Sequence, residues 1–408
     1  MIKELTIKNF RSIREASLEL GRFTVLNGAN NSGKSSVLYA LQVLKNVVTN
    51  PNQSLDSLLN LSFLDLGGIG ETVFGKKKET GLKLGITSES NVYRGIVAKF
   101  AWEFQDTHGN SFHLEGISPH TFKGKMGISF PYSLVKSEEI EIEYGDEENE
   151  KIILVWNGIG VNDIIDEDEG YLDSEGYDEL ETEANLPTSD LFQLDFVPTR
   201  RGFTKPSFNS IPLRNGIYSE DEVATLLVTD KDLKNKVSYY FEKITDKQFS
   251  VSMVEGFGFF YLKVREPKSG FTTELVNQGM GVNQILFLLA KILYDKNRLI
   301  CIDEPEIHLH PTLIEQFVKV LVEIAEKEDK QFIFSTHSEH WLMSMLAEVN
   351  DGNLKAEDLK VYYLTKEEQE TKVEGQQVHP NGQIEGGLKN FLEAQMRLAN
   401  RFFDHQPA

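Results

Sequence analysis

The sequence predicts an α/β fold in which helices pack on a mostly parallel sheet. Apolar strand-like runs alternate with helical runs between residues 282 and 364, a pattern typical of parallel strands joined by helical crossovers. Near the N-terminus, a glycine-rich loop stands between an apolar run and an amphipathic run, which indicates strand, loop and helix. From about 82 to 160, several β-rich runs with intervening Gly- and Asp-rich turns predict an additional antiparallel region.

The first half of the chain contains predicted strands and one predicted helix. Ile2–Ile7 alternates apolar and polar residues, which predicts a strand, and Phe23–Leu26 is a second, short apolar strand. Ser35–Val48 has the apolar spacing of an amphipathic helix. In the β-rich region we expect strands at Leu82–Ile86, Arg94–Phe104, Ile140–Tyr144 and Ile152–Trp156.

The stretch Asp163–Asn185 is acidic, contains glycine and lacks apolar periodicity. We therefore expect a mobile, solvated insertion there. A solubilising loop is the favoured interpretation, and a docking segment for a basic partner is the alternative.

The second half returns to regular patterns. Its runs predict a hairpin, further strands and several helices. The predicted strands are Leu194–Val197, Phe249–Val254, Phe257–Val264, Leu299–Ile302, Gln331–Ser335 and Leu359–Leu364, and the helical spacing falls in Asp221–Thr245, Val282–Leu293, Thr312–Glu326 and Glu339–Leu346.

The charge of the chain is unevenly distributed. The 408 residues carry a net charge of −21, and the stretch from Glu138 to Asp190 has 20 acidic residues and one basic residue, Lys151. That stretch contributes −19, so everything else sums to −21 minus −19, or −2. DNA binding therefore stays open, although scattered lysines on a solvated face are the simpler interpretation of the basic positions.

Cysteine use and hydropathy indicate the compartment. The single cysteine, Cys301, lies inside an apolar run, so no disulfide framework exists. No apolar run approaches the ~20 residues of a membrane span, and the N-terminus has no secretory apolar region. We expect a cytoplasmic protein with no membrane partner.

Gly28–Ser35 matches the pattern GxxxxGKS and is flanked by the predicted strand and helix. Glycines at 28 and 33 allow backbone amides to point at a polyphosphate, and the following helix start favours negative charge. Lys34 would reach the β- and γ-phosphates and the Ser35 hydroxyl would ligate Mg²⁺. The alternative is a Gly/Asn turn without a ligand.

Asp303 and Glu304 follow the apolar strand Leu299–Ile302. Metal-dependent phosphoryl transfer needs such a pair, because one carboxylate can hold Mg²⁺ and the other can accept a proton from attacking water. The alternative is an acidic strand end that caps a helix. Together with the phosphate loop, the pair predicts an Mg-ATP site.

Four segments resemble the SMC, RecF and OLD (overcoming lysogenization defect) ATPases, which are ABC-type proteins that are not transporters. The segments are Ile2–Ser12, Asn30–Ser36, Asp303–Pro311 and Ser335–Ser338, and weaker similarities lie at Phe196–Arg201 and Pro380–Ile384. The resemblance is closest to the OLD-like branch and covers about residues 1–75 and 190–390. It implies an ABC-type P-loop NTPase head, with a mixed or parallel sheet flanked by helices and an inserted β-rich and acidic region.

The resemblance also implies a division of the chain into four segments. These are an N-terminal lobe of the ATPase head (1–85), a β-rich insertion with the acidic mobile segment (86–190), a C-terminal part of the head (191–365) and an extension (366–408).

In such heads ATP lies between two protomers, and the resemblance assigns residues to each side. One protomer would bind ATP through Gly28, Asn30, Asn31, Ser32, Gly33, Lys34, Ser35, Ser36 and Arg11, and Mg²⁺ through Ser35 and Asp303. The expected catalytic residues are Glu304 as base, His337 as the switch histidine on the γ-phosphate or the attacking water, and Lys34. The second protomer would supply a signature segment with Gly279, Gly281, Asn283 and Gln284.

Several alternatives accompany these assignments. The signature departs from the better-known LSGGQ form, so a Gly-rich N-cap of a buried helix stays open. His337 could be structural, and Arg11 could form a surface salt bridge. His308 and His310 suit contacts between subunits better than a zinc site, because no third ligand is near in the sequence. No Q-loop glutamine can be assigned; the stretch Asp65–Glu71 occupies the expected region.

OLD proteins carry a Toprim nuclease domain after the ATPase, whereas only 43 residues follow Thr365 here. We therefore expect an ATPase without a nuclease, which dimerises on ATP and acts in DNA repair or anti-phage defence with an effector nuclease or toxin from another polypeptide. The alternative is a nucleotide-gated oligomeric scaffold that holds an effector and hydrolyses ATP slowly. An ABC transporter subunit is a distant third possibility.

Overall fold

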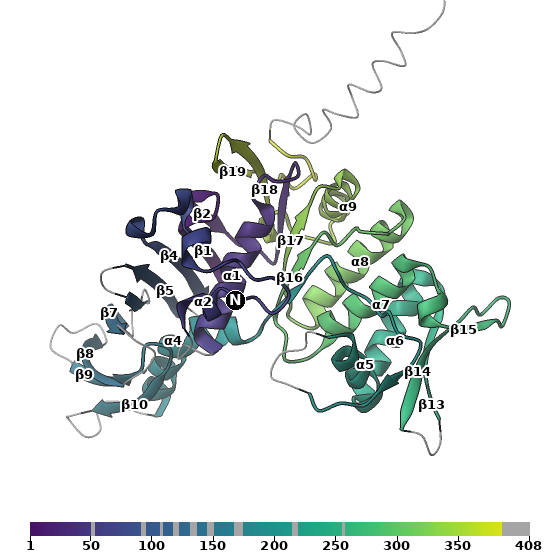
Figure 1. The fold of residues 1–408 in the computed structure, drawn as a ribbon, viewed down its shortest axis with the longest axis horizontal. Coiled ribbons are helices and arrows are strands. Elements are labelled where there is room, and N and C mark those ends of the chain that lie inside the picture. The colour runs from purple at the N-terminus through teal and green to yellow at the C-terminus, as the bar shows by residue number, and fades with distance from the viewer. Residues whose placement is uncertain are drawn as a thin grey trace, which may run out of the picture. The chain divides into compact units, whose positions relative to one another are not determined.

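The structure, a computed structural model, describes residues 1–49, 54–90, 95–106, 109–116, 122–130, 137–144, 151–166, 174–213, 219–254 and 258–385. The chain forms two compact units (Figure 1). Unit 1 contains Met1–Leu20, Gly33–Phe196 and Thr365–Val373, and unit 2 contains Gly21–Ser32, Val197–Leu364 and Glu374–Ala408. Each unit is assembled from separate stretches, whereas the four predicted segments are continuous, and that linear division stays a prediction.

Unit 1 is built on a nine-stranded sheet with the order β10-β9-β8-β7-β6-β5-β4-β1-β2. Neighbouring strands are antiparallel, which confirms the predicted antiparallel region. The strands are β1 (Ile2–Phe10), β2 (Ile13–Glu19), β4 (Leu82–Glu89), β5 (Val97–Gln105), β6 (Gly109–Gly116), β7 (Phe122–Phe130), β8 (Glu138–Tyr144), β9 (Lys151–Trp156) and β10 (Val161–Asp166).

The two faces of this sheet differ in polarity because successive side chains point to opposite faces. Apolar side chains such as Leu5, Leu84, Phe100 and Trp102 are fully buried on one face. The helices α1 (Lys34–Thr49) and α4 (Ser174–Phe192) both contact strands of this sheet. The opposite face carries polar and charged side chains.

The interpretation of Asp163–Asn185 as an irregular insertion is wrong where the structure describes it. Residues 163–166 end β10, and Ser174 opens the 19-residue helix α4. Leu180, Ala184 and Leu191 are buried, so this helix is stabilised by packing, although its acidic composition weakens the pattern. Residues 167–173 lie outside the described residues.

Unit 2 is organised by parallel pairing. β16 (Leu299–Asp303), β17 (Gln331–Thr336), β3 (Phe23–Gly28) and β18 (Leu359–Glu367) are parallel neighbours in this order. They belong to a six-stranded sheet with the order β11-β16-β17-β3-β18-β19, in which β11 is Leu194–Val197 and β19 is Glu370–Gln376. The mostly parallel sheet predicted from the alternating pattern is therefore present.

Helices of unit 2 enclose a large apolar core with the parallel strands. Phe23, Ile300, Phe332 and Phe334 from the strands are fully buried in this core. The helices are α5 (Glu220–Thr229), α6 (Lys231–Thr245), α7 (Met280–Leu293), α8 (Pro311–Lys327) and α9 (Glu339–Asn350). The helical spacing expected at 221–245 corresponds to two helices, because Asp230 ends α5 and caps α6 through the amide of Leu233 at 2.9 Å.

Short elements complete the fold. A small antiparallel sheet in unit 2 contains the predicted hairpin. Its strands are β12 (Phe208–Asn209), β13 (Gln248–Met253), β14 (Phe259–Arg265) and β15 (Thr272–Glu274), and the remaining helical turns are α2 (Leu55–Leu58), α3 (Ile69–Thr72), η1 (Phe74–Lys76), η2 (Lys78–Thr80), η3 (Leu275–Asn277) and η4 (Ala356–Asp358).

Two further observations concern hydrophobic segments. Cys301 is buried in β16, two residues before Asp303. Among the residues that the structure describes, no helix is both long and apolar enough to cross a membrane.

Candidate functional site

The loop between β3 and α1 has a backbone that glycine makes possible. Gly28 and Gly33 have φ angles of +153° and +101°. A Cβ atom at Gly28 would lie 2.3 Å from the carbonyl oxygen of Leu364, and one at Gly33 would lie 2.3 Å from Oγ1 of Thr371. Both glycines are therefore needed for close packing as well as for their conformation.

The start of α1 presents positive charge. Lys34, the first residue of the helix, is buried with an exposed fraction of 6%, and the first turn contains no acidic residue. Unpaired amides and the helix dipole favour an anion at such an end. Ala29, Asn30 and Asn31 of the loop are exposed. The loop and helix start thus have the chemistry of a phosphate site, and the contacts assigned to Asn30, Asn31, Ser32, Ser35 and Ser36 stay predictions.

Arg11 is held against α1 in unit 1. Its guanidinium carbon lies 5.3 Å from the centre of the Tyr39 ring, and its backbone N–H donates to the carbonyl oxygen of Thr72 at 2.6 Å. Burial lowers the pKa of Arg11, against the opposing effect of Tyr39. The structure thus gives Arg11 a cation–π partner on the helix that begins with Lys34, and its contact with ATP stays a prediction.

The carboxylates Asp303 and Glu304 lie at the end of β16. Asp303 is paired in register with Ser335 on β17, and the Ser335 hydroxyl donates to Oδ1 of Asp303. Glu304 has a φ of +50°, and its N–H donates to the carbonyl oxygen of Ser335 at 2.8 Å. A non-glycine residue in this region is strained, and such strain is common where a side chain must be aimed at a ligand.

His337 follows β17 and lies beside these carboxylates. Its Nδ1 is 3.2 Å from Oε1 of Glu304 and 3.6 Å from Oε1 of Glu306. Half of the His337 side chain is exposed, at 50%, so it remains accessible to a ligand. The predicted base and the predicted switch histidine are therefore in direct contact within unit 2.

Glu306 accepts hydrogen bonds from residues at the end of β17. Its Oε1 accepts from the Thr336 hydroxyl at 2.6 Å and from the N–H of His337 at 3.3 Å. Burial raises the pKa of Glu306, against the hydrogen bond from Thr336 and the other donors. No role for this residue was predicted from the sequence, and the structure shows that it holds the backbone of His337, the predicted switch histidine.

Arg201 is the main residue that the sequence analysis left without a role. Its guanidinium donates to the carbonyl oxygens of Asp303 at 2.7 Å, Glu304 at 2.6 Å and Pro198 at 3.1 Å. Burial lowers its pKa to about 10, so the side chain stays cationic at neutral pH. Arg201 therefore fixes the backbone of both predicted catalytic carboxylates. The similarity at Phe196–Arg201 was the available sequence signal, but it named no partner.

The donor set suits Mg²⁺ held mainly by a substrate. Among the described residues, no group of three or more His, Cys, Asp or Glu side chains could hold a metal ion. Mg²⁺ commonly takes only one or two protein oxygens and completes its shell with phosphates and water. The assignment of Ser35 and Asp303 as Mg²⁺ ligands stays a prediction, and the zinc alternative at His308 and His310 gains no support. His310 caps α8, with Nδ1 accepting from the N–H of Thr312 at 3.3 Å.

The predicted signature segment has an exposed beginning and a buried end. Gly279 is the exposed N-cap of α7, whereas Asn283 and Gln284 are buried with 2% of their surfaces exposed. The Asn283 amide accepts from the N–H of Phe203 and donates to its carbonyl oxygen, both at 2.8 Å. The Asn283 side chain thus makes hydrogen bonds to the backbone of a loop in its own unit. The backbone around Gly279 and Gly281 is the accessible part of the segment.

Asn283→Ala is expected to lower the free energy of unfolding by roughly 2 kcal/mol, because two buried backbone groups of Phe203 lose their partners. Urea unfolding monitored by circular dichroism measures the change. The exposed Asn277→Ala is a control, with an expected change under about 0.5 kcal/mol. Equal stability of both variants would remove the structural role assigned to Asn283.

Comparisons with known proteins are consistent with this geometry. A family model described as "AAA ATPase domain" matches residues 1–342. The SmcHead bound to the C-winged helix domain of ScpA has a TM-score of 0.53 at 13% identity, covering 92% of this chain and 97% of that chain. The Smc head domain with an extended coiled coil from Pyrococcus furiosus, bound to the C-terminal domain of ScpA, has a TM-score of 0.50 at 10% identity, covering 98% and 99%. The predicted fold class is thus confirmed.

Sequence relatives match shorter regions. An OLD nuclease from Thermus scotoductus is 33% identical over 98 residues, which are 21% of this chain and 19% of that protein. The uncharacterized protein MJECL10 from Methanocaldococcus jannaschii is 55% identical over 42 residues, 10% of this chain and 19% of that protein. The chain thus spans about a fifth of the length of the curated relatives it matches.

Proposed function

Because the chain belongs to the AAA ATPase domain family, we propose that it binds Mg-ATP at Gly28–Ser35 and hydrolyses it with Glu304 as the base. One observation carries the proposal. The carboxyl ends of the parallel strands β16, β17 and β3 are neighbours, and they lead respectively to Glu304, His337 and the phosphate loop. Ligands of parallel α/β sheets bind at this edge.

The protein's own groups divide the chemistry as follows. Glu304 accepts the proton of the attacking water, and His337, in contact with it, can donate a hydrogen bond to the phosphate or orient the water. Lys34 and the loop amides offset the negative charge that develops on the phosphoryl oxygens. Mg²⁺, when bound through Ser35 and Asp303, supplies further charge neutralisation.

We also propose that ATP joins two copies of the chain, so that the exposed start of α7 in one copy completes the site of the other. Met280, directly after Gly279, is 51% exposed. A residue that contacts a second copy would be exposed in this way in a single chain. The amides at the start of α7 can face a phosphate in the same way as those of α1. Gly279 and Gly281 are the residues with this proposed role in trans.

Mixing two inactive variants tests the arrangement in trans. Lys34→Ala removes the phosphate lysine, and Gly279→Asp places a negative charge at the start of α7. Each variant alone is expected to be inactive, but a mixed dimer contains one site with both parts intact. An equal mixture should recover about a quarter of the wild-type phosphate release, because random pairing makes half of the dimers mixed and half of their sites intact. No recovery in a mixture shown to exchange subunits would refute completion in trans.

We further propose that the ATPase acts in DNA repair or anti-phage defence, together with an effector nuclease or toxin from another polypeptide. The proposed compartment is the cytoplasm. The support is the partial similarity to an OLD nuclease. Phosphate release with and without DNA, together with identification of proteins that co-purify with the native complex, tests this proposal. Indifference to DNA together with a stably bound effector would favour the nucleotide-gated scaffold instead.

A further inference from the structure

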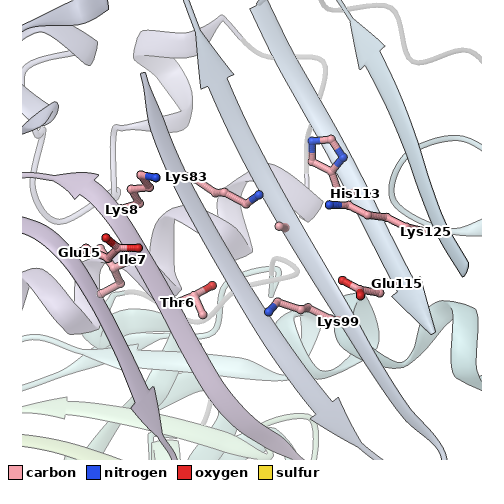
Figure 2. A pocket seen from close by; sticks show the side chains of 10 residues that line it. Thr6, Ile7, Lys8, Glu15, Lys83, Lys99, His113, Glu115 and Lys125 are labelled. Atoms are coloured by element: carbon pink, nitrogen blue, oxygen red, sulfur yellow. The ribbon is translucent and has the colours of Figure 1, made fainter. Parts of the chain in front are cut away.

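A second polar site lies on the charged face of the nine-stranded sheet in unit 1, where a hollow of about 310 Å³ opens (Figure 2). Cross-strand register places small residues in one row across the floor. Thr6 pairs with Gly85, Gly85 with Ala101, Ala101 with His113 and His113 with Gly127. Three of these five residues have no side chain beyond Cβ. The sheet surface is therefore recessed along the row relative to the longer side chains beside it.

Lysines stand on both sides of this row. Lys8 and Lys83 lie two residues from it in one direction along their strands, and Lys99 and Lys125 lie two residues from it in the other. At about 3.4 Å per residue, the two pairs are roughly 13 Å apart along the strands. Figure 2 shows all four lysines and His113 around the hollow. Side chains from both sides can therefore reach one ligand.

The positive charges are only partly compensated. Lys83 has Glu103 at 3.5 Å, but Lys8, Lys99 and Lys125 make no hydrogen bond or ion pair with another residue that the structure describes. Lys8 and Lys83 are direct cross-strand neighbours, an arrangement of like charges that costs stability. Burial and the charges of Lys83 and Lys125 lower the pKa of His113, against the effect of Glu103. Glu15 is paired in register with Lys8, and Glu115 lies between Lys99 and Lys125, so the repulsion that an anion in the hollow would relieve is that between Lys8 and Lys83.

The surroundings favour a small anion over a long one. On the β2 side the hollow is bordered by Glu15, and on the same face β8 adds Glu139, Glu141 and Glu143 beyond β7. An extended polyanion that crosses the sheet would therefore meet carboxylates on both sides. Among the described residues that line the hollow there is also no Phe, Tyr or Trp side chain on which a nucleobase could stack.

We propose that this hollow binds a compact phosphate-bearing anion, of the size of a di- or triphosphate, through Lys8, Lys83, Lys99 and Lys125. Glu15 and Glu115 also line the hollow, and they can accept hydrogen bonds from hydroxyl or amino groups attached to the phosphate. The residues that line the hollow are distinct from those of the phosphate loop, so the hollow is a binding site for a second ligand.

In the experiment, the whole 408-residue chain is titrated with inorganic tripolyphosphate in the absence of Mg²⁺, and binding is measured by isothermal titration calorimetry. The Lys34→Ala background removes the lysine of the phosphate loop. We expect saturable binding in this background and about a tenfold or greater weakening when Lys99→Gln and Lys125→Gln are added, because two charged donors are lost. Lys99→Arg with Lys125→Arg keeps the charges and should retain affinity within about threefold.

The matched control is Lys77→Gln with Lys78→Gln, which removes the same charge from an exposed segment of unit 1. It should change affinity by less than about twofold. Equal weakening by both double variants, or absence of saturable binding, would overturn the proposal. Tighter binding of a single-stranded oligonucleotide, lost in the Lys99/Lys125 variant, would replace it by a nucleic-acid surface. Thermal unfolding verifies that each variant is folded, and ATP hydrolysis by Lys34→Ala alone tests the phosphate loop independently.

Discussion

Glu304→Gln is expected to bind ATP with nearly unchanged affinity and to lose turnover by about 10³-fold, since positioned general bases contribute about 10²–10⁴-fold. The substitution keeps the size and shape of the side chain at the end of β16 but removes its ability to accept a proton. Nδ1 of His337 loses its nearer carboxylate partner, Glu304 at 3.2 Å, and keeps Glu306 at 3.6 Å. ATP would therefore stay bound, and the proposed ATP-dependent dimer should persist longer than in the wild type.

Three measurements separate these effects. Steady-state phosphate release gives turnover, fluorescent-ATP titration gives affinity, and analytical ultracentrifugation with ATP gives the oligomer. Glu315→Gln, an exposed change on α8, is the matched control and should leave all three unchanged. Wild-type phosphate release from Glu304→Gln would show that another group accepts the proton.

Arg201→Ala is expected to lower kcat by about 100-fold, because displacement of a catalytic group by about 1 Å can cost that much. It should also lower the free energy of unfolding by roughly 3 kcal/mol, since three partly buried carbonyl oxygens lose a charged donor. The guanidinium bonds to the carbonyl oxygens of Asp303 and Glu304, and Glu304 has the strained φ of +50°. Without this anchor, the backbone can relax and move the carboxylate.

Arg201→Lys distinguishes positioning from simple charge. Lysine keeps the positive charge but lacks the planar fork that serves two carbonyl groups at once. We expect partial recovery of stability but a kcat still at least about tenfold low, with KM for ATP changed less than kcat. The exposed neighbour Arg200→Ala is the control and should behave as the wild type. Full activity of Arg201→Lys would reduce the role of this residue to its charge.

The sequence predicted the segments whose chemistry and spacing are local. Phe23–Leu26 is followed by Gly28–Lys34, and every feature of that loop lies within one short stretch, so strand, loop and helix could be recognised together. The same holds for Asp303 after its strand. The contact between Glu304 and His337 follows from parallel pairing of β16 and β17, which the alternating pattern indicated.

The missed features depend on contacts between distant residues. Arg201 meets its carbonyl partners 102 and 103 residues along the chain, and Asn283 meets Phe203 across 80 residues. No local pattern specifies such pairs. The helix α4 was missed for a related reason: its few apolar residues, among them Leu180 and Leu191, are buried by tertiary packing, while its composition resembles that of a solvated segment.

Because Cys301 is buried, the rate at which its thiol is modified reports on local opening of the structure around it. It is the one thiol in the sequence, and it lies in β16 two residues before Asp303. A thiol reagent can modify it only while that strand is open, so the rate of modification counts local openings of the central parallel sheet. A ligand that binds only the closed form slows the reaction by mass action. The affinity of a ligand that binds at the carboxyl edge of the sheet can thus be measured from the slower modification of Cys301, without an introduced label.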